Sequence, residues 1–320
     1  MSELYPEYKD KLIWPAVPGI ILILATAFVG FFGNANIIIA TCRTKALHTN
    51  CCILIATTAF FDIIHQLAHI IFALRFFAIN YFMELDSCFY MQIAFVFAMN
   101  FGSFAYLSVG LDRLCCVIFP SRYYNQLNRV YRIPYLVVML LLPTVYSSTL
   151  LFLAHDAIGP AKDEMVVCFI TDVFYGHMQR TWNSVQWITF AVTVVSYCLL
   201  WLMIRIKNAT YARKLTKTVT YIMGTLVFGW FITTFVGMAA SQAHATPYTM
   251  FLIHTDFGWP ANLGIAANYF IYYSTNTEYR RAFSDQLAML FLWRVDRKKR
   301  NVTDIHVISD LRRKSSRQTG

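Results

Sequence analysis

The chain has 320 residues, of which 58% are hydrophobic, 17% are aromatic and only 14% are charged. Soluble domains carry about 25% charged residues, so this composition excludes an ordinary soluble protein. The formal net charge of +10 is also found in nucleic-acid-binding proteins, but the placement of the basic residues, given below, argues against such a partner.

The apolar residues form seven blocks separated by short polar stretches, and each block is long enough to cross a bilayer as a helix. Helices are expected because open strands would leave backbone groups without hydrogen bonds in lipid. The chain is therefore predicted to be an all-α membrane protein, a seven-transmembrane helix bundle over residues 16–273 preceded by an extracellular N-terminus at 1–15. The predicted spans are Ala16–Thr41, Cys51–Leu74, Cys88–Phe119, Ile133–Leu153, Ser184–Ile206, Thr218–Ser241 and Thr249–Tyr273.

Basic residues are distributed unevenly between the two sides of these spans. With the N-terminus outside the cell, only five of the 27 Lys and Arg residues lie on the outer side, namely Lys9, Lys11, Arg75, Lys162 and Arg180. The other twenty-two lie on the cytoplasmic side, where the leaflet is anionic. This bias predicts a multi-pass protein of the cell membrane with its N-terminus outside. The lipid bilayer, and not nucleic acid, is the expected partner of the basic residues.

The eight cysteines also fall unequally on the two sides. Only Cys88, at the start of the third span, and Cys168, in the second outer loop, lie outside. An oxidising exterior favours a disulfide between the cysteines that it reaches. We therefore expect a Cys88–Cys168 bridge that ties the top of the third helix to this loop, and we expect loss of either cysteine to abolish function.

The third span ends in an ionisable pair, Asp112 and Arg113. Charged groups at the edge of hydrocarbon are costly, which makes this pair a candidate functional site. A static ion pair between the two residues is one interpretation. Because adjacent helical residues do not face each other, we instead expect Arg113 to keep donors free and to act as a latch, held by the acid in one state and released toward a partner in another.

A short amphipathic helix is predicted directly after the seventh span. Thr275 and Glu278 fit a capping box, and apolar residues then recur at helical spacing. Residues 274–292 are expected to form a membrane-surface helix rather than an eighth span, because Asp285 and Gln286 interrupt the apolar run. Residues 293–320 form a basic cytoplasmic tail.

Several motifs occur together along the chain. They are GFFGNANII at 30–38 in the first span, VGLDRL at 109–114 and FPSRY at 119–123 around the end of the third, and YRRAF at 279–283. In this combination the chain resembles the rhodopsin-like G protein-coupled receptors, and most closely the nematode serpentine chemoreceptors of the Srsx class. The resemblance implies a chemosensory receptor of the cell membrane, including that of sensory cilia, which binds a small extracellular ligand and activates a heterotrimeric G protein. It implies no enzymatic activity and no cofactor.

The resemblance also assigns roles to individual residues. Those that would couple the bundle to the G protein are Asp112, Arg113, Tyr197 and Tyr272. Those that would form a polar core at mid-bilayer, as one another's partners, are Asn34, Asp62 and Asn268. Those that would line an aromatic ligand pocket are Met91, Phe95, Met99, Trp187, Trp230, Trp259 and Asn262. Each pocket residue equally suits packing between helices, and the two tyrosines also suit anchors at the membrane interface.

The chain departs from the family pattern in its fifth and sixth spans. Both lack the usual proline, so a bend in the sixth would come from Gly224 or Gly229. No acidic residue occurs between Arg205 and Thr220, so the ion pair that joins Arg113 to the sixth helix in some family members cannot form. We therefore expect basal activity to be less tightly held.

Other functional classes fit the chain less well. His65 and His69 share a helix face with Asp62 and could hold a metal, but packing within the bundle is the favoured interpretation. The seventh span has no lysine for a retinal Schiff base, which excludes an opsin. A channel or transporter would need charges or broken helices along a pathway. A neuropeptide or neuromodulator receptor of the same fold is the nearer alternative.

Overall fold

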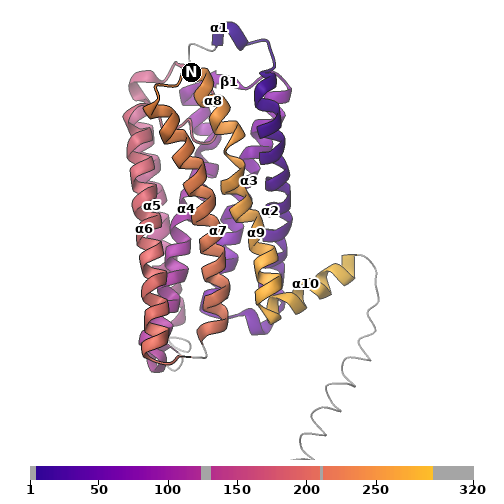
Figure 1. Cartoon of the computed structure of the whole chain (residues 1–320), viewed down its shortest axis with the longest axis vertical. Helices are drawn as coiled ribbons and strands as arrows, with labels where there is room; N and C mark the ends of the chain where they lie inside the picture. Colours follow the sequence, from indigo (N-terminus) through magenta and orange to yellow (C-terminus); the bar gives the residue numbers. More distant parts are fainter. Residues whose placement is uncertain (1–4, 124–130, 210–211, 291–320) are drawn as a thin grey trace, which may run out of the picture.

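The computed structural model describes residues 5–123, 131–209 and 212–290, so the predicted tail at 293–320 lies outside the described residues. Long helices run side by side in one bundle (Figure 1). The short helix α1 (Tyr5–Tyr8) lies at one end of this bundle, and α10 (Thr277–Leu290) lies across the other end. We call these the outer and the inner end.

Six of the described helices, some with a short 3-10 turn at one end, are long and apolar enough to cross a membrane. Their α-helical parts are α2 (Val17–Arg43), α3 (Asn50–Phe77), α4 (Leu85–Ile118), α5 (Arg132–Ile158), α6 (His177–Ile206) and α7 (Arg213–Gln242). Together with the two helices of the last crossing, they confirm the all-α seven-transmembrane bundle that the apolar blocks predict.

The last crossing is divided between α8 (Pro247–Asp256) and α9 (Trp259–Thr275). The span predicted at Thr249–Tyr273 is thus interrupted at Phe257 and Gly258. Pro260 has no N–H with which to continue a helical hydrogen-bond pattern. A Cβ on Gly258 would lie 2.6 Å from the carbonyl oxygen of His254, so this tight junction requires glycine. The composition of the block did not reveal the break, because both halves are apolar.

α4 occupies the centre of the bundle and packs against α3, α5 and α6. Most residues of α4 are buried, whereas the helices at the periphery of the bundle present large apolar side chains on their free faces. Ile133 and Phe152 of α5 are 75% and 72% exposed. An apolar exterior of this kind is what a lipid environment requires, because lipid, unlike water, imposes no cost on it.

Two helix boundaries differ from the predicted ones. α6 begins at His177 rather than at Ser184, directly after Gly176, whose positive φ of 58° turns the chain into the helix. α10 begins at Thr277, and its cap is Asn276 rather than the predicted Thr275. The Asn276 Oδ1 accepts hydrogen bonds from the backbone N–H groups of Glu278 and Tyr279 at 3.0 and 3.3 Å.

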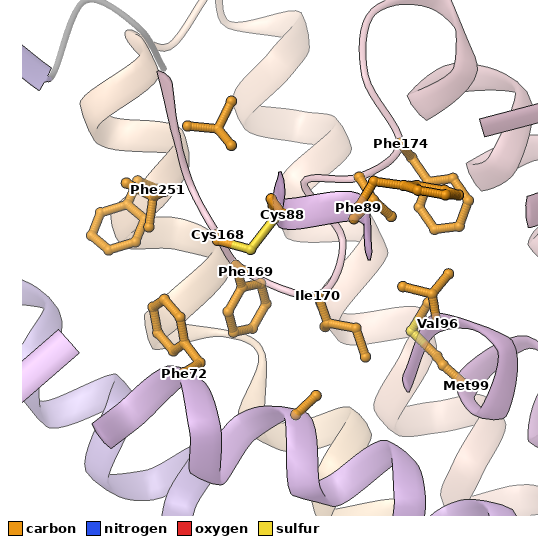
Figure 2. Packing of buried hydrophobic residues seen from close by; sticks show 14 of the residues in the cluster. Phe72, Cys88, Phe89, Val96, Met99, Cys168, Phe169, Ile170, Phe174 and Phe251 are labelled. Carbon is orange, nitrogen blue, oxygen red and sulfur yellow. A yellow bond between two sulfur atoms is a disulfide. The ribbon is translucent and has the colours of Figure 1, made fainter. Parts of the chain in front are cut away.

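The outer end carries a small two-stranded antiparallel sheet that the sequence did not predict. β1 (Phe82–Glu84) precedes α4 and pairs with β2 (Met165–Val167) in the second outer loop. The predicted disulfide between Cys88 and Cys168 is present directly beside this sheet, and it is confirmed (Figure 2). The sheet and the disulfide together hold this loop against the top of α4.

The chain after Cys168 turns inward and fills the outer end of the bundle. Phe169, Ile170 and Phe174 are all buried there (Figure 2). The Phe169 ring meets the Phe72 ring of α3 edge to face, with centroids 5.0 Å apart. The outer end is therefore closed by aromatic packing, of the kind that stabilises a protein core.

Candidate functional site

The Arg113 side chain lies near the inner end of α4 and is buried, with 8% of the residue exposed. Its Nε donates to the Asp112 Oδ2 at 2.8 Å, and a second guanidinium nitrogen contacts the same oxygen. A fully desolvated charge would be very costly, and this ion pair offsets that cost.

Two tyrosines complete the environment of this ion pair. The Tyr123 hydroxyl accepts a hydrogen bond from the Arg113 guanidinium at 2.7 Å and donates to the Asp112 Oδ1 at 2.9 Å. The Tyr135 hydroxyl of α5 donates to the same Oδ1 at 2.9 Å. The ion pair is therefore enclosed by hydroxyl groups from the segment after α4 and from the neighbouring helix.

The expectation that Arg113 keeps its donors free is wrong for this arrangement. Adjacent helical positions do diverge, but the long arginine side chain folds back along the helix and reaches Asp112. This geometry corresponds to the held state of the predicted latch. An ion pair between the two residues, the interpretation that the sequence left open as an alternative, is present in the structure.

Tyr197 and Tyr272 lie at two other places in the inner half. Tyr197 of α6 is buried against α4, where a Cβ on Gly110 would come within 2.7 Å of its ring. Tyr272 of α9 packs against Tyr279 of α10, with ring centroids 4.6 Å apart. Among the described residues, neither hydroxyl hydrogen-bonds to Arg113. Their role in coupling stays a prediction.

The predicted polar core depends on a residue that the sequence did not single out. The Tyr106 hydroxyl of α4 donates to the Asp62 Oδ2 at 2.9 Å and accepts from the Asn268 Nδ2 at 3.1 Å. Asn34 lines the same small cavity, of about 10 Å³, but its amide has no hydrogen-bond partner among the described residues. Tyr106 thus joins two of the three predicted residues, and Asn34 lies beside them.

Most of the predicted pocket residues lie around the cluster that closes the outer end. Met99 and Trp230 are buried in it, while Met91, Phe95 and Trp259 pack against it. The cavity that Met99 and Trp230 help to line has a volume of about 10 Å³, room for about one water molecule. The outer loop therefore occupies the space in which a ligand was expected.

Two tryptophans of α6 point in different directions. Trp187 is half-buried outside the outer cluster, with its ring edge-on to Phe231 of α7 and centroids 5.5 Å apart. Trp182 points inward instead. Its Nε1 donates to the Asn100 Oδ1 at 2.9 Å, and its ring stacks on Phe174 of the outer loop at 4.6 Å. The start of α6 at His177 is what places Trp182 on a helix at all.

A second inward polar residue lies one turn further along α6. The Gln186 Nε2 donates to the same Asn100 Oδ1 at 2.8 Å. The Asn100 Nδ2 and the Gln186 Oε1 stay buried without a hydrogen-bond partner in the part of the chain that the structure describes. Unsatisfied buried polar atoms cost free energy, so this pair is poised to bind a polar group.

The outer loop also carries titratable groups. The Tyr175 hydroxyl donates to Glu164 at 2.5 Å, and this hydrogen bond raises the pKa of Tyr175 to about 12. Asp172 accepts a hydrogen bond from the Phe169 N–H at 3.4 Å, but burial dominates and raises the pKa of Asp172 to about 7. Its ionisation therefore falls within the neutral pH range.

The sequence profile of the serpentine-type seven-transmembrane chemoreceptor family Srsx matches residues 27–287. The match covers most of the chain, beginning within α2 and ending within α10. The chain belongs to the Srsx family. No curated protein matches it.

Membership of this family makes the chain a multi-pass membrane receptor, not a member of an enzyme family. The matched region contains both the ion pair at the inner end of the receptor and the loop that closes its outer end. The site residues that sequence reasoning missed carry mainly hydroxyl or amide groups, and these groups contact the predicted site residues. Tyr106 and Arg113 lie on one face of α4, at i and i+7, which is a signal that the sequence offered.

The histidines of α3 pack within the bundle of the receptor. Both His65 and His69 are buried, and their ring centroids lie 5.2 Å apart. Within the described ranges, no group of three or more potential metal ligands comes together. His69 instead lies against Phe169 of the outer loop, with centroids 5.7 Å apart.

Proposed function

We propose that this Srsx receptor binds a small external ligand at its outer end and activates a heterotrimeric G protein at its inner end. The observation that carries the proposal is the buried Arg113, held by Asp112 and Tyr123 at the inner end of the central helix. A guanidinium with such defined partners can exchange them for a protein partner when the helices part. We take the described arrangement to be the inactive one.

The charges of the chain support the proposed orientation. Basic residues are concentrated at the end that carries Arg113, which favours that end as the cytoplasmic one. The N-terminus and the disulfide then face the exterior, where an oxidising environment favours the bond. The family is one of chemoreceptors, which supports the cell membrane of sensory cells and their cilia as the location.

The ligand would act on the aromatic cluster below the outer loop. The unpaired Asn100 Nδ2 and Gln186 Oε1 atoms favour a compound with one hydrogen-bonding group and an otherwise apolar body. Such a compound would have to displace Phe174 from Trp182 as it enters. It shifts the receptor only through a difference in affinity between the closed and the open arrangement.

The test is nucleotide exchange on purified G proteins in membranes that contain the receptor, with a panel of volatile and water-soluble compounds as ligands. We expect at least one compound to stimulate exchange and Arg113→Gln to abolish the stimulation. Arg180→Gln is the matched control, because Arg180 is an exposed arginine at the outer end. Ligand-evoked current that persists without G protein would contradict the proposal.

A further inference from the structure

A groove of about 730 Å³ lies between the inner half of α6 and the middle of α7. Its volume lies within the range of about 300–1,000 Å³ that small-molecule sites occupy. The residues that line it include Tyr197, Trp201, Arg205, Met223, Gly224 and Phe228.

The groove exists because the two helices lean on different neighbours. α6 packs mainly on α4 and α7 mainly on α9, so α6 and α7 touch each other only sparsely. One polar contact joins them here, from the Trp201 Nε1 to the Thr220 Oγ1 at 2.9 Å. Opposite, Gly224 leaves open space, since a Cβ at this position would meet no atom within 4 Å.

The open side of the groove faces the membrane. Leu202 on its α6 rim is 51% exposed, and Phe228 on its α7 rim is 66% exposed. These are large apolar side chains in spans that cross the hydrocarbon region, so water is a poor occupant. An acyl chain satisfies the apolar walls and is present at high concentration in the bilayer.

One end of the groove is positively charged. Arg205 lies in the last turn of α6, and its guanidinium makes no hydrogen bond or ion pair with any residue that the structure describes. Its neighbour Lys207 is already engaged, because its Nζ donates to the Ile118 carbonyl at 2.7 Å. A basic group between helices at the cytoplasmic surface is suited to the phosphate of an anionic lipid.

We propose that this groove binds an anionic phospholipid of the inner leaflet, with one acyl chain between α6 and α7 and the headgroup phosphate on Arg205. The assignment of this lipid to the inner leaflet rests on the proposed orientation of the receptor in the membrane. Binding itself does not rest on G-protein coupling, so it is measured without a chemosensory ligand and without G protein.

The first test is native mass spectrometry of the purified full chain titrated with phosphatidylserine or phosphatidylcholine. We expect phosphatidylserine to bind preferentially and Arg205→Gln to weaken its binding about fivefold, the effect of one arginine near an anionic headgroup. Arg281→Gln is the control, since its side chain is 75% exposed on α10. Equal binding of the two lipids, or equal loss in both variants, would overturn the proposal.

The second test fills the groove. Gly224→Leu places a side chain in the open space, so we expect it to reduce phosphatidylserine binding while the chain stays folded. Gly159→Leu is its match, because Gly159 also has open space around it but lies at the outer end of α5. Unchanged lipid binding in folded Gly224→Leu would contradict the proposed site.

A third measurement needs no variant. Phosphatidylserine with a diazirine in its acyl chain should cross-link to peptides within residues 194–205 and 220–231, which contain the groove. Labelling of α5 to the same extent would show a non-specific lipid shell and would overturn the proposal. This result stands independently of whether the chain activates a G protein.

Discussion

The two carboxylate oxygens of Asp112 have different partners. Oδ2 accepts only from Arg113 among the described residues, whereas Oδ1 accepts from Tyr123 and Tyr135. The acid therefore stays hydrogen-bonded even when the arginine leaves. Tyr123 differs from Tyr135 in that it also binds the guanidinium. Release of Arg113 would therefore remove a contact of Tyr123 but no contact of Tyr135.

Removal of the Tyr123 hydroxyl should loosen the held state. Tyr123→Phe deletes one hydrogen bond to a charged group, worth about 1 kcal/mol or more, so we expect basal nucleotide exchange to rise about fivefold. Tyr131→Phe is the control, since Tyr131 is 57% exposed nearby. If both variants show the basal rate of the unaltered receptor, Tyr123 does not hold Arg113 in the membrane.

The hydrogen bonds of Tyr106 are expected to affect the stability of the receptor rather than its signalling. Tyr106→Phe would leave Asp62 and Asn268 without their common partner, and we expect a loss of about 1–2 kcal/mol of unfolding free energy. The measurement is the midpoint of thermal unfolding in detergent. The control is the midpoint of Tyr90→Phe, because Tyr90 is 58% exposed. A midpoint equal to that of Tyr90→Phe would show that the polar core is satisfied in another way.

At this scale the sequence predicts which residues carry charge and polarity but not how they meet. The Cys88–Cys168 bridge follows from topology, because only two cysteines lie on the outer side. The contact of Arg113 with Asp112 depends on a side-chain rotamer, and helical spacing alone predicted the opposite. Trp182 was missed and Trp187 chosen because the predicted start of the fifth span, at Ser184, excluded the former.

At the scale of elements, the outer loop differs from an ordinary surface loop because several of its side chains are buried in the bundle. Phe169 and Phe174 are buried as deeply as the aromatic residues of the helices, and Asp172 is half-buried beside them. A carboxyl group whose pKa is raised in the folded state contributes stability below its unfolded pKa, near 4, and loses it as the pH rises through about 7.

We therefore expect the receptor to be more stable at pH 5 than at pH 8, in part because of Asp172. Asp172→Asn removes the titrating group and should flatten the dependence of the unfolding midpoint on pH. Asp163→Asn is the matched control on the same loop, since Asp163 is exposed. If Asp172→Asn has the same pH profile as the unaltered chain, other groups cause the dependence.

The helix α10 depends on a single cap. Asn276→Ala removes the acceptor for two backbone N–H groups and should destabilise the first turn by about 1 kcal/mol. Hydrogen exchange of the amides of Thr277–Leu290 measures this directly, with Ser274→Ala as the control because its exposed hydroxyl only contacts a carbonyl within α9. Faster exchange in both variants alike would point to general fraying.

The elements themselves were largely predictable, and their ends were not. Long apolar blocks predict spans reliably because lipid admits few alternatives. The break at Gly258 depends on a close backbone contact, which hydropathy does not detect. The sheet of β1 and β2 is short and joins segments far apart in the chain, so its residues carry no local pattern that would identify it.

At the scale of the whole molecule, α7 and α9 pack closely against each other. A Cβ on Gly229 would lie 2.3 Å from the backbone oxygen of Pro260, so the two helices meet at this glycine. The sequence suggested Gly224 and Gly229 alike as sources of a bend. Their surroundings differ completely, since Gly224 has only open space around it.

This difference gives a matched pair of substitutions. Gly229→Ala should force α7 and α9 apart and cost about 2 kcal/mol of unfolding free energy, whereas Gly224→Ala should be neutral or slightly stabilising. The unfolding midpoint and the amount of receptor at the cell surface measure both effects. Equal behaviour of the two alanine variants would contradict the close packing at Gly229.

The disulfide implies an order in which the parts of the receptor assemble during biogenesis. Cys88 and Cys168 are 80 positions apart, and both precede the last three crossings in the chain. Oxidation can thus fix the loop in place before α6 and α7 have packed against it. Later helices must then assemble around a lid that is already in position, so a delay in thiol oxidation should harm biogenesis more than the same bond's reduction harms the finished protein.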